Sequence, residues 1–173
     1  MTVQELTAMI RDIPDFPKPG ILFRDITPIL ADPRALRAVL DHLETWAASD
    51  APEMIAGIEA RGFMFGPPLA ARLGAGFVPV RKPGKLPHSI VSESYALEYG
   101  ENTLEMHEDA VRPGQKVLIV DDLLATGGTA SAAASLVRQL GGEVSGFLFM
   151  VELAALDGRS QLGGLPVRSL IGL

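Results

Sequence analysis

Short apolar segments alternate with stretches of helical character from residue 54 to the end of the chain, and this alternation constrains the fold more than any other feature. The apolar segments predict strands at residues 54–60, 76–80, 116–122, 143–153 and 166–173. Helices are predicted at residues 65–73 and about 129–140, and each ends at a glycine. Strands and helices in this order form a parallel sheet covered on both faces. The predicted fold class is therefore α/β, with a mostly parallel twisted sheet flanked by helices.

Three loops follow the first three predicted strands. Ligands of open parallel sheets bind outside the carboxyl ends of the strands, so these loops are the predicted place for a ligand. They comprise residues 59–63, 81–87 and 121–129.

The last of these loops contains a short run of small residues, Ala125, Thr126, Gly127, Gly128 and Thr129. It leads into a predicted helix, so its backbone N–H groups and hydroxyls would point at a ligand where the helix dipole is positive. Glycines also let the main chain approach an anion closely. The run is neither a Walker A loop nor a G-x-G-x-x-G turn. Taken alone, it is compatible with a phosphate site or with a plain helix start.

Two adjacent carboxylates, Asp121 and Asp122, precede this run. Carboxylates are poor ligands for phosphate but good acceptors for hydroxyls, as when an acid holds ribose. A ribose 5-phosphate would match this layout. A phosphoacceptor site of the receiver type is the competing interpretation, but its acidic pair is not expected to run directly into such a helix start.

Four cations fall at the ends of the first two predicted strands, although the chain carries a net charge of −6. These cations are Arg61, Arg81, Lys82 and Lys85. A solvated surface patch would explain any one of them, whereas four on one edge suggest a second, highly charged anion such as pyrophosphate. A ribose phosphate that bears pyrophosphate would satisfy both groups of residues.

The bulk composition excludes several classes of protein. With 21 acidic and 15 basic residues, the chain lacks the basic character of a nucleic-acid-binding protein. It has no cysteine, which excludes thiolate catalysis and cysteine-based zinc sites. It shows neither a signal-type N-terminus nor an apolar window of about 18 residues. We expect a cytoplasmic protein of one domain, residues 1–173, with no nucleic-acid or membrane partner.

Two further segments stand outside the alternation. The proline-rich stretch 13–30 is not expected to be regular helix, because Pro14, Pro17, Pro19 and Pro28 interrupt it. Before it, Thr2 and Glu5 have the spacing of a capping box, and after it a helix should begin at Pro33. Residues 92–107 have the period of a hairpin, which is either a surface hairpin or a lid over the strand ends.

The motifs resemble those of one enzyme family. VLIVDDLLATGGTA (117–130) resembles the phosphoribosyl pyrophosphate signature of the type I phosphoribosyltransferases. Within that family the companion motifs are similar to those of the adenine phosphoribosyltransferases, in order and spacing, over nearly the whole chain. They are DFPKPGILFRDITPIL (15–30), AGIEARGFMFGPPLA (56–70), RKPGKLP (81–87) and SYALEYG (94–100). The terminal VRSLIGL lacks the aromatic residue expected there.

This resemblance implies a type I phosphoribosyltransferase fold with a small N-terminal hood, about residues 1–33, and a flexible hairpin lid, about residues 88–108. The implied reaction joins adenine to the 5-phosphoribosyl group of phosphoribosyl pyrophosphate, giving AMP and pyrophosphate. Mg²⁺ is the implied cofactor, carried mainly by the substrate with no direct protein ligand, and a homodimer is the implied assembly. A purine other than adenine, or a sensor that binds the substrate without catalysis, remains an alternative.

The resemblance also implies roles for individual residues. Glu98 would exchange a proton with the base, and Asp121 and Asp122 would stabilise positive charge on the ribose ring. Leu22, Phe23 and Arg24 would bind adenine, largely through the main chain. A cis peptide is implied at Glu59–Ala60. The residues expected to bind phosphoribosyl pyrophosphate are Arg61, Arg81, Lys82, Lys85, Tyr99, Asp121, Asp122, Ala125, Thr126, Gly127, Gly128 and Thr129.

Overall fold

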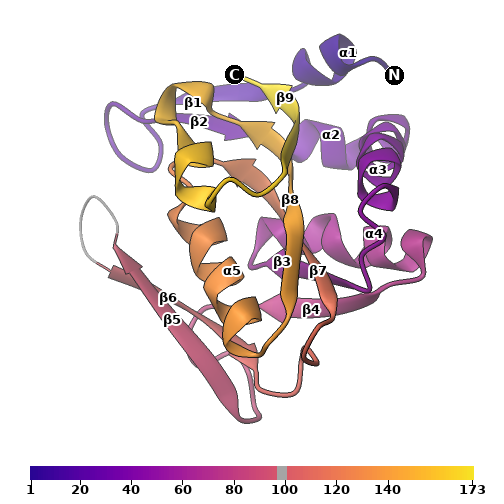
Figure 1. The fold of residues 1–173 in the computed structure, drawn as a ribbon. Coiled ribbons are helices and arrows are strands. Elements are labelled where there is room, and N and C mark those ends of the chain that lie inside the picture. Colours follow the sequence, from indigo (N-terminus) through magenta and orange to yellow (C-terminus); the bar gives the residue numbers. More distant parts are fainter. Residues whose placement is uncertain (97–100) are drawn as a thin grey trace. The chain divides into compact units, whose positions relative to one another are not determined.

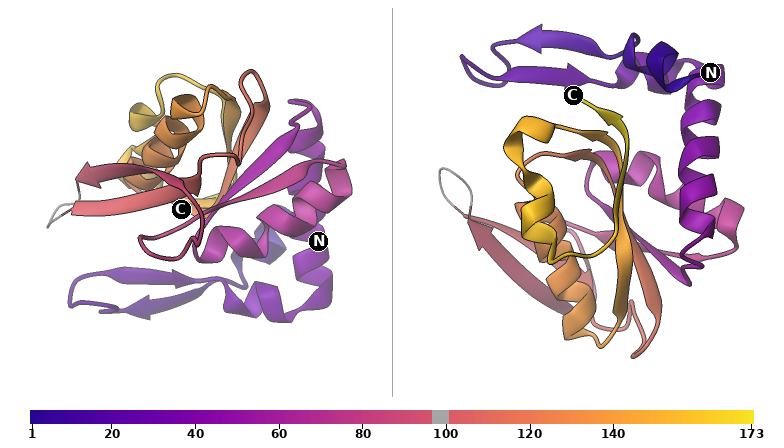
Figure 2. Two further views of the ribbon diagram at one scale, coloured as in Figure 1. Left: turned by 90° about the horizontal axis from the view of Figure 1, so that it is seen from below. Right: turned by 45° about the horizontal axis from the view of Figure 1, so that its top comes forward.

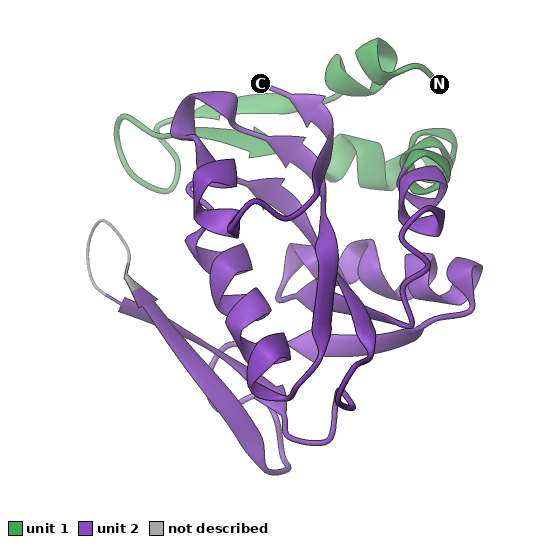
Figure 3. Ribbon diagram, in the orientation of Figure 1, with its two compact units in different colours: residues 1–42 green, residues 43–173 purple. Residues whose placement is uncertain are grey.

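The structure is a computed structural model that describes residues 1–96 and 101–173 (Figure 1). Its contacts divide the chain into two compact units, residues 1–42 and 43–173 (Figure 3). The long helix α3 (Pro33–Ala48) runs from the first unit into the second. The single domain over residues 1–173 stays a prediction.

The first unit opens with helix α1 (Val3–Thr7), and its capping box is confirmed. The Glu5 N–H donates to Thr2 Oγ1 at 3.2 Å, and the Thr2 N–H donates back to Glu5 Oε2 at 2.7 Å. Helix α3 also begins where predicted, because Asp32 Oδ1 accepts from the N–H groups of Arg34 and Ala35.

The proline-rich stretch contains more regular structure than the sequence predicted. Strands β1 (Arg11–Pro14) and β2 (Leu22–Asp25) form an antiparallel pair. Helix α2 (Thr27–Ala31) follows, so the expectation that Pro28 interrupts helix was wrong. Pro28 lies in the first turn of α2, where proline is tolerated because its missing N–H would have had no partner within the helix.

The second unit is built on a five-stranded parallel sheet, which confirms the predicted fold class. Its order is β4-β3-β7-β8-β9. The strands are β3 (Met54–Ile58), β4 (Gly76–Val80), β7 (Lys116–Leu124), β8 (Glu143–Glu152) and β9 (Val167–Gly172). Strand β7 extends two residues beyond its predicted end at residue 122, to Leu124. Asp121 and Asp122, which the prediction placed both in the strand and in the loop 121–129, belong to the strand.

Helices cover both faces of this sheet. Helix α4 (Gly66–Leu73) follows the short 3₁₀ helix η1 (Arg61–Met64), and helix α5 (Gly128–Gln139) covers the opposite face (Figure 2). Val117, Leu118, Ile119 and Val120 of the central strand β7 are all buried. A strand covered on both faces requires such a continuous apolar run, which is why the sequence predicted it.

A separate antiparallel hairpin is formed by β5 (Ile90–Ala96) and β6 (Glu101–His107), as predicted. Two short 3₁₀ helices, η2 (Ala154–Leu156) and η3 (Gly158–Leu162), connect β8 to β9. Across the part of the chain that the structure describes, no helix is both long enough and apolar enough to cross a membrane.

Candidate active site

The strand order defines where a ligand can enter the sheet. From β3 the chain adds β4 on one side, and it then adds β7, β8 and β9 in turn on the other side. The crevice in such a sheet opens between the two strands where the order reverses, at their carboxyl ends. Here those strands are β3 and β7. Arg61 lies just after the carboxyl end of β3, and Asp121 and Asp122 lie near the carboxyl end of β7.

An ion pair spans this switch point. Arg61 Nε lies 2.9 Å from Asp122 Oδ2, and Asp122 is only 4% exposed. The next residue, Gly62, approaches β7 so closely that an added Cβ would lie 2.8 Å from the Val120 carbonyl oxygen and 3.0 Å from Asp121 Oδ1. The loop after β3 is therefore fixed against the acidic end of β7.

The two adjacent carboxylates have different environments. Burial raises the pKa of Asp121 well above its usual value, and the nearby Asp122 charge raises it further. Burial also raises the pKa of Asp122, but the Arg61 guanidinium opposes that change. Asp121 Oδ1 accepts from the Asp122 N–H at 2.9 Å. Asp122 is thus the better stabilised anion, and Asp121 binds a proton more tightly.

Residues 125–129 form the turn that leads from β7 into α5, and its last two residues, Gly128 and Thr129, are the first two of the helix. Gly127 has a φ of 88° and is the N-cap of α5. A Cβ on Gly127 would lie 2.3 Å from the carbonyl oxygen of Gly158, and a Cβ on Gly158 would lie 2.2 Å from that of Ala125. The backbone at the start of η3 thus packs directly against this turn, and residues 127 and 158 must both be glycine.

The loop after β4 is held at its start by Glu59. Glu59 Oε2 accepts from Arg81 Nε at 3.1 Å and from the Lys82 N–H at 3.1 Å. Burial opposes ionisation of Glu59, but the Arg81 and Lys82 hydrogen bonds outweigh it, and the pKa of Glu59 is lowered. The Arg81 guanidinium carbon lies 5.9 Å from the centre of the Phe63 ring, so the loops after β3 and β4 meet.

The same loop is held further along by Glu105 of β6. Glu105 Oε2 accepts from the Gly84 N–H at 3.0 Å, and the Glu105 and Arg81 main chains exchange two hydrogen bonds. Glu105 is 9% exposed, whereas Lys82 and Lys85 are exposed. Two carboxylates from distant parts of the chain thus shape a loop whose lysines face solvent.

The residues expected to bind adenine lie in the first unit, on β2. Phe23 packs edge to face on Phe16 with ring centres 5.2 Å apart, and Arg24 forms an ion pair with Asp12. Leu22 is 43% exposed. Leu22 and Arg24 are two residues apart on one strand, so their main-chain groups face the same edge of β2.

Two predicted residues, Glu98 and Tyr99, lie outside the described residues. The predicted cis peptide at Glu59–Ala60 is confirmed.

The sequence reasoning missed four residues that shape the site. Glu59 and Glu105 accept hydrogen bonds from the loop after β4, and Gly158 packs against the turn 125–129. Tyr95 is hydrogen-bonded to Thr129. A signal existed for Glu105, since it is a lone carboxylate between two apolar residues of a predicted strand. None existed for Gly158, which looks like any loop glycine.

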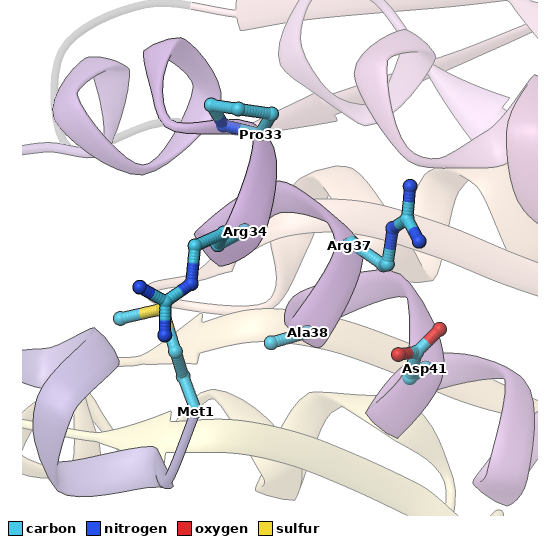
Figure 4. Close-up of a pocket in the computed structure, with 6 residues that line it drawn as sticks. All are labelled: Met1, Pro33, Arg34, Arg37, Ala38 and Asp41. Atoms are coloured by element: carbon cyan, nitrogen blue, oxygen red, sulfur yellow. The ribbon is translucent and has the colours of Figure 1, made fainter.

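None of the predicted site residues that the structure describes lines the hollow that Figure 4 shows on the first unit. It is lined by Met1, Pro33, Arg34, Arg37, Ala38 and Asp41, mostly from the first turns of α3. Both arginine side chains are exposed and the hollow is open to solvent, so it shows none of the enclosure of a small-molecule site.

Known proteins share this fold and sequence. The chain matches the phosphoribosyl transferase domain family over residues 29–161. It is 62% identical over 171 residues to the adenine phosphoribosyltransferase of Sorangium cellulosum, covering 96% of this chain and 86% of that one. The solved adenine phosphoribosyltransferase of Thermoanaerobacter pseudethanolicus superposes with a TM-score of 0.97 at 55% identity, covering 99% of this chain and all of that one.

The chain belongs to the adenine phosphoribosyltransferase family. The predicted family is thereby confirmed, and with it an enzyme of the pentosyltransferase class. A further member, from Saccharomyces cerevisiae, was solved in complex with an imino-altritol bisphosphate and adenine. It superposes with a TM-score of 0.91 at 44% identity, covering 97% of each chain.

Proposed function

We propose that this chain transfers the 5-phosphoribosyl group of phosphoribosyl pyrophosphate to adenine, at the switch point between β3 and β7. The products are AMP and pyrophosphate, and the reaction belongs to purine salvage. The observation that carries the proposal is the ion pair of Arg61 with the buried Asp122 beside Asp121, flanked by a glycine turn on one side and a basic loop on the other.

The turn 125–129 would hold the 5-phosphate. The N-terminus of α5 begins there, so its first N–H groups lack partners within the helix and suit an anion. Thr126 is exposed and Thr129 is partly buried, so both hydroxyls are near enough to the surface to reach a ligand. A phosphate in this turn would place the ribose toward the end of β7.

Asp121 and Asp122 would accept hydrogen bonds from the ribose hydroxyls. As the bond from C1 to pyrophosphate breaks, positive charge develops on the ring, and fixed carboxylates stabilise that charge. Asp122 is suited to this role because the Arg61 guanidinium pairs with it and opposes the effect of burial on its pKa. Positive charge that develops on the ribose ring would favour the ionised form of Asp121.

The leaving pyrophosphate would be bound by Arg61 and by the loop of Arg81, Lys82 and Lys85. Within the described ranges 1–96 and 101–173, no three histidine or acidic side chains gather into a metal site. Carboxylate oxygens at the end of β7 are compatible with a hard cation nearby, and the magnesium ion would be carried mainly by the oxygens of the substrate, with no direct protein ligand. When bound, it would neutralise charge on the departing pyrophosphate.

Base recognition and proton transfer complete the proposal. The main chain at Leu22 and Arg24 would hydrogen-bond adenine, with Phe23 beside the ring. Glu98 would exchange a proton with the base, and Tyr99 would help to close the site.

The direct test incubates the purified chain with phosphoribosyl pyrophosphate and Mg²⁺ and offers adenine, hypoxanthine and guanine separately. Adenine should be converted to AMP, and kcat/KM should exceed that for the other bases by ~10⁴–10⁵, because each of them mispairs a fixed main-chain donor and acceptor. Nucleotide formed equally from hypoxanthine would refute the adenine assignment. Substrate binding without any nucleotide would identify a sensor.

Three further proposals accompany the reaction. We expect turnover to stop in excess EDTA and to return with added Mg²⁺. We propose a homodimer, on family membership, and light scattering should then give twice the 18.4 kDa of one chain. We also propose a cytoplasmic location, which fractionation of cells that express the protein would test.

A further inference from the structure

The hairpin β5–β6 lies along helix α5 (Figure 1). Side chains alternate along β5: Val91, Glu93 and Tyr95 are partly buried, whereas Ser92 and Ser94 are exposed. Val91 and Tyr95 pack against the same apolar cluster as the buried face of α5. The stem of the hairpin is therefore docked on α5.

Two side-chain hydrogen bonds join the hairpin to opposite ends of α5. At the C-terminal end, Gln139 Nε2 donates to Glu93 Oε2 at 2.7 Å. At the N-terminal end, Thr129 Oγ1 donates to the Tyr95 hydroxyl oxygen at 3.1 Å. The second bond ends on a residue of the turn that we assign to the 5-phosphate.

The direction of that bond matters, because a threonine hydroxyl has one proton to donate. With Thr129 donating to Tyr95, it presents only lone pairs to a ligand. A phosphate offers only acceptors, so binding requires that Thr129 turn its proton toward the phosphate. The tyrosine hydroxyl can then donate to Thr129 Oγ1, since it is both donor and acceptor.

We infer that Tyr95 is a positioning residue for the 5-phosphate: its hydroxyl holds the Thr129 side chain in place and reverses its hydrogen bond when the phosphate binds. No heavy atom needs to move in this exchange. A chain of hydroxyls that donate in one direction is also mutually polarised, which strengthens the last bond to the anion. The inference rests on the proposed function of residues 125–129.

The test compares Tyr95→Phe with the wild type. Removing one hydroxyl from a neutral hydrogen bond should raise KM for phosphoribosyl pyrophosphate roughly three- to tenfold. The KM for adenine and the kcat should stay within twofold. Thermal unfolding of the variant should show whether the fold is intact, since phenylalanine preserves the packing of the ring.

Two matched controls separate the hydroxyl from hairpin docking. Gln139→Ala removes the other bond between α5 and the hairpin, and Ser94→Ala removes a cross-strand hydroxyl contact with Thr103, 2.8 Å away, on the exposed face. Both should leave KM for phosphoribosyl pyrophosphate unchanged. A rise with Gln139→Ala equal to that with Tyr95→Phe would overturn the inference, because loosened docking would then explain both.

A double-mutant cycle with Thr129 distinguishes this inference from the proposed function. Thr129→Val should raise KM for phosphoribosyl pyrophosphate, and adding Tyr95→Phe to it should have no further effect, whereas Tyr95→Phe should still act in a Thr129→Ser background. If Thr129→Val raises KM and Tyr95→Phe does not, the role of Tyr95 is refuted and the phosphate turn stands. If neither variant changes KM, both assignments fail at Thr129.

Discussion

The two loops proposed to bind the anionic ends of the substrate are built in different ways. The turn 125–129 derives its shape from its own glycines and from a close backbone approach by Gly158. The loop 81–85 derives its shape from two carboxylates, Glu59 and Glu105, which accept its main-chain and arginine hydrogens. The shape of the first loop depends on backbone contacts that leave no room for a side chain at its glycine. The shape of the second loop depends on hydrogen bonds with residues elsewhere in the chain.

This difference suits the two anions. A terminal phosphate binds to a ring of N–H groups in one geometry, which an unyielding backbone provides. A leaving pyrophosphate must be bound and then released, and exposed lysines on a loop held by side chains can adjust to both states. The comparison therefore predicts that a Cβ added in the turn 125–129 reduces activity strongly. In the loop 81–85, an added Cβ should have a smaller effect than the loss of the Glu59 or Glu105 carboxylate that accepts its hydrogen bonds.

The largest expected effect comes from adding one methyl group to each loop. Gly127 and Gly84 both have positive φ, 88° and 75°, so alanine strains the backbone similarly at the two positions. Only at Gly127 does the new Cβ also meet an atom, since nothing lies within 4 Å at Gly84. Gly127→Ala should therefore reduce kcat/KM for phosphoribosyl pyrophosphate by about 100-fold or more, through displacement of the turn.

Gly84→Ala is the matched control for that experiment and should cost less than about tenfold, because it adds strain of about 1–3 kcal/mol without a clash. Steady-state kinetics and Tm measured on both variants decide the matter. Equal losses would show that backbone strain alone matters, and the contrast between the loops would then be wrong.

The next effect concerns the acceptors of the basic loop. Glu105→Ala removes the hydrogen-bond partner of the Gly84 N–H, so we expect KM for phosphoribosyl pyrophosphate to rise about three- to tenfold, the typical value of one hydrogen bond. Glu105→Gln retains an acceptor oxygen and should restore most of the affinity. Glu108→Ala, at an exposed acid nearby, is the control and should have no effect. A failure of glutamine to rescue would mean that charge, and not hydrogen bonding, holds the loop.

The smallest effect concerns stability. Burial and the Asp122 charge raise the pKa of Asp121, so the folded protein binds this proton more tightly than the unfolded chain does. The contribution of Asp121 to the free energy of unfolding is therefore fully present below the ordinary pKa of aspartate. It is lost as the pH rises from there through the raised pKa of the folded state. Asp121→Asn removes that loss, because asparagine carries no charge at any of these pH values. At neutral pH the variant should gain about 1 kcal/mol in the free energy of unfolding, which would raise Tm by about 2–4 °C in a chain of this length.

A Tm series across pH checks this prediction. The curves of wild type and Asp121→Asn should meet at low pH and separate as the pH rises, while kcat of the variant falls. The contrast with the other loop is direct, because the pKa of Glu59 is lowered and its contribution is instead lost as the pH falls. A variant that is less stable than wild type at neutral pH would show that Asp121 is needed for folding.

Much of the fold was predictable because its signals are local. The strands β3, β4, β7 and β8 are mostly apolar, and glycines follow α4 and α5 closely, so each element could be recognised from its own residues. The β1–β2 pair was missed because prolines obscure its alternation, and α2 because proline at the start of a helix resembles proline that breaks one.

The site was predictable only in part for the same reason. The turn 125–129 and the acidic pair stand together in the sequence, whereas the partners that define their environment do not. Asp122 is 61 positions from Arg61, and Gly84 is 21 from Glu105. Contacts of this kind depend on strand order, which no single segment encodes.

The reciprocal contact of Gly127 and Gly158 also bears on protein engineering. A Cβ on Gly127 would meet the carbonyl oxygen of Gly158, and a Cβ on Gly158 would meet that of Ala125, so neither position accepts a side chain while the two backbones lie this close. A chimera that imports the phosphate turn from a distant relative without the segment between β8 and β9 would join two surfaces shaped for different neighbours. The unit that can be transferred between proteins therefore comprises two separate segments, residues 125–129 and residues 158–161. A library that varies the first segment should vary the second in the same clones.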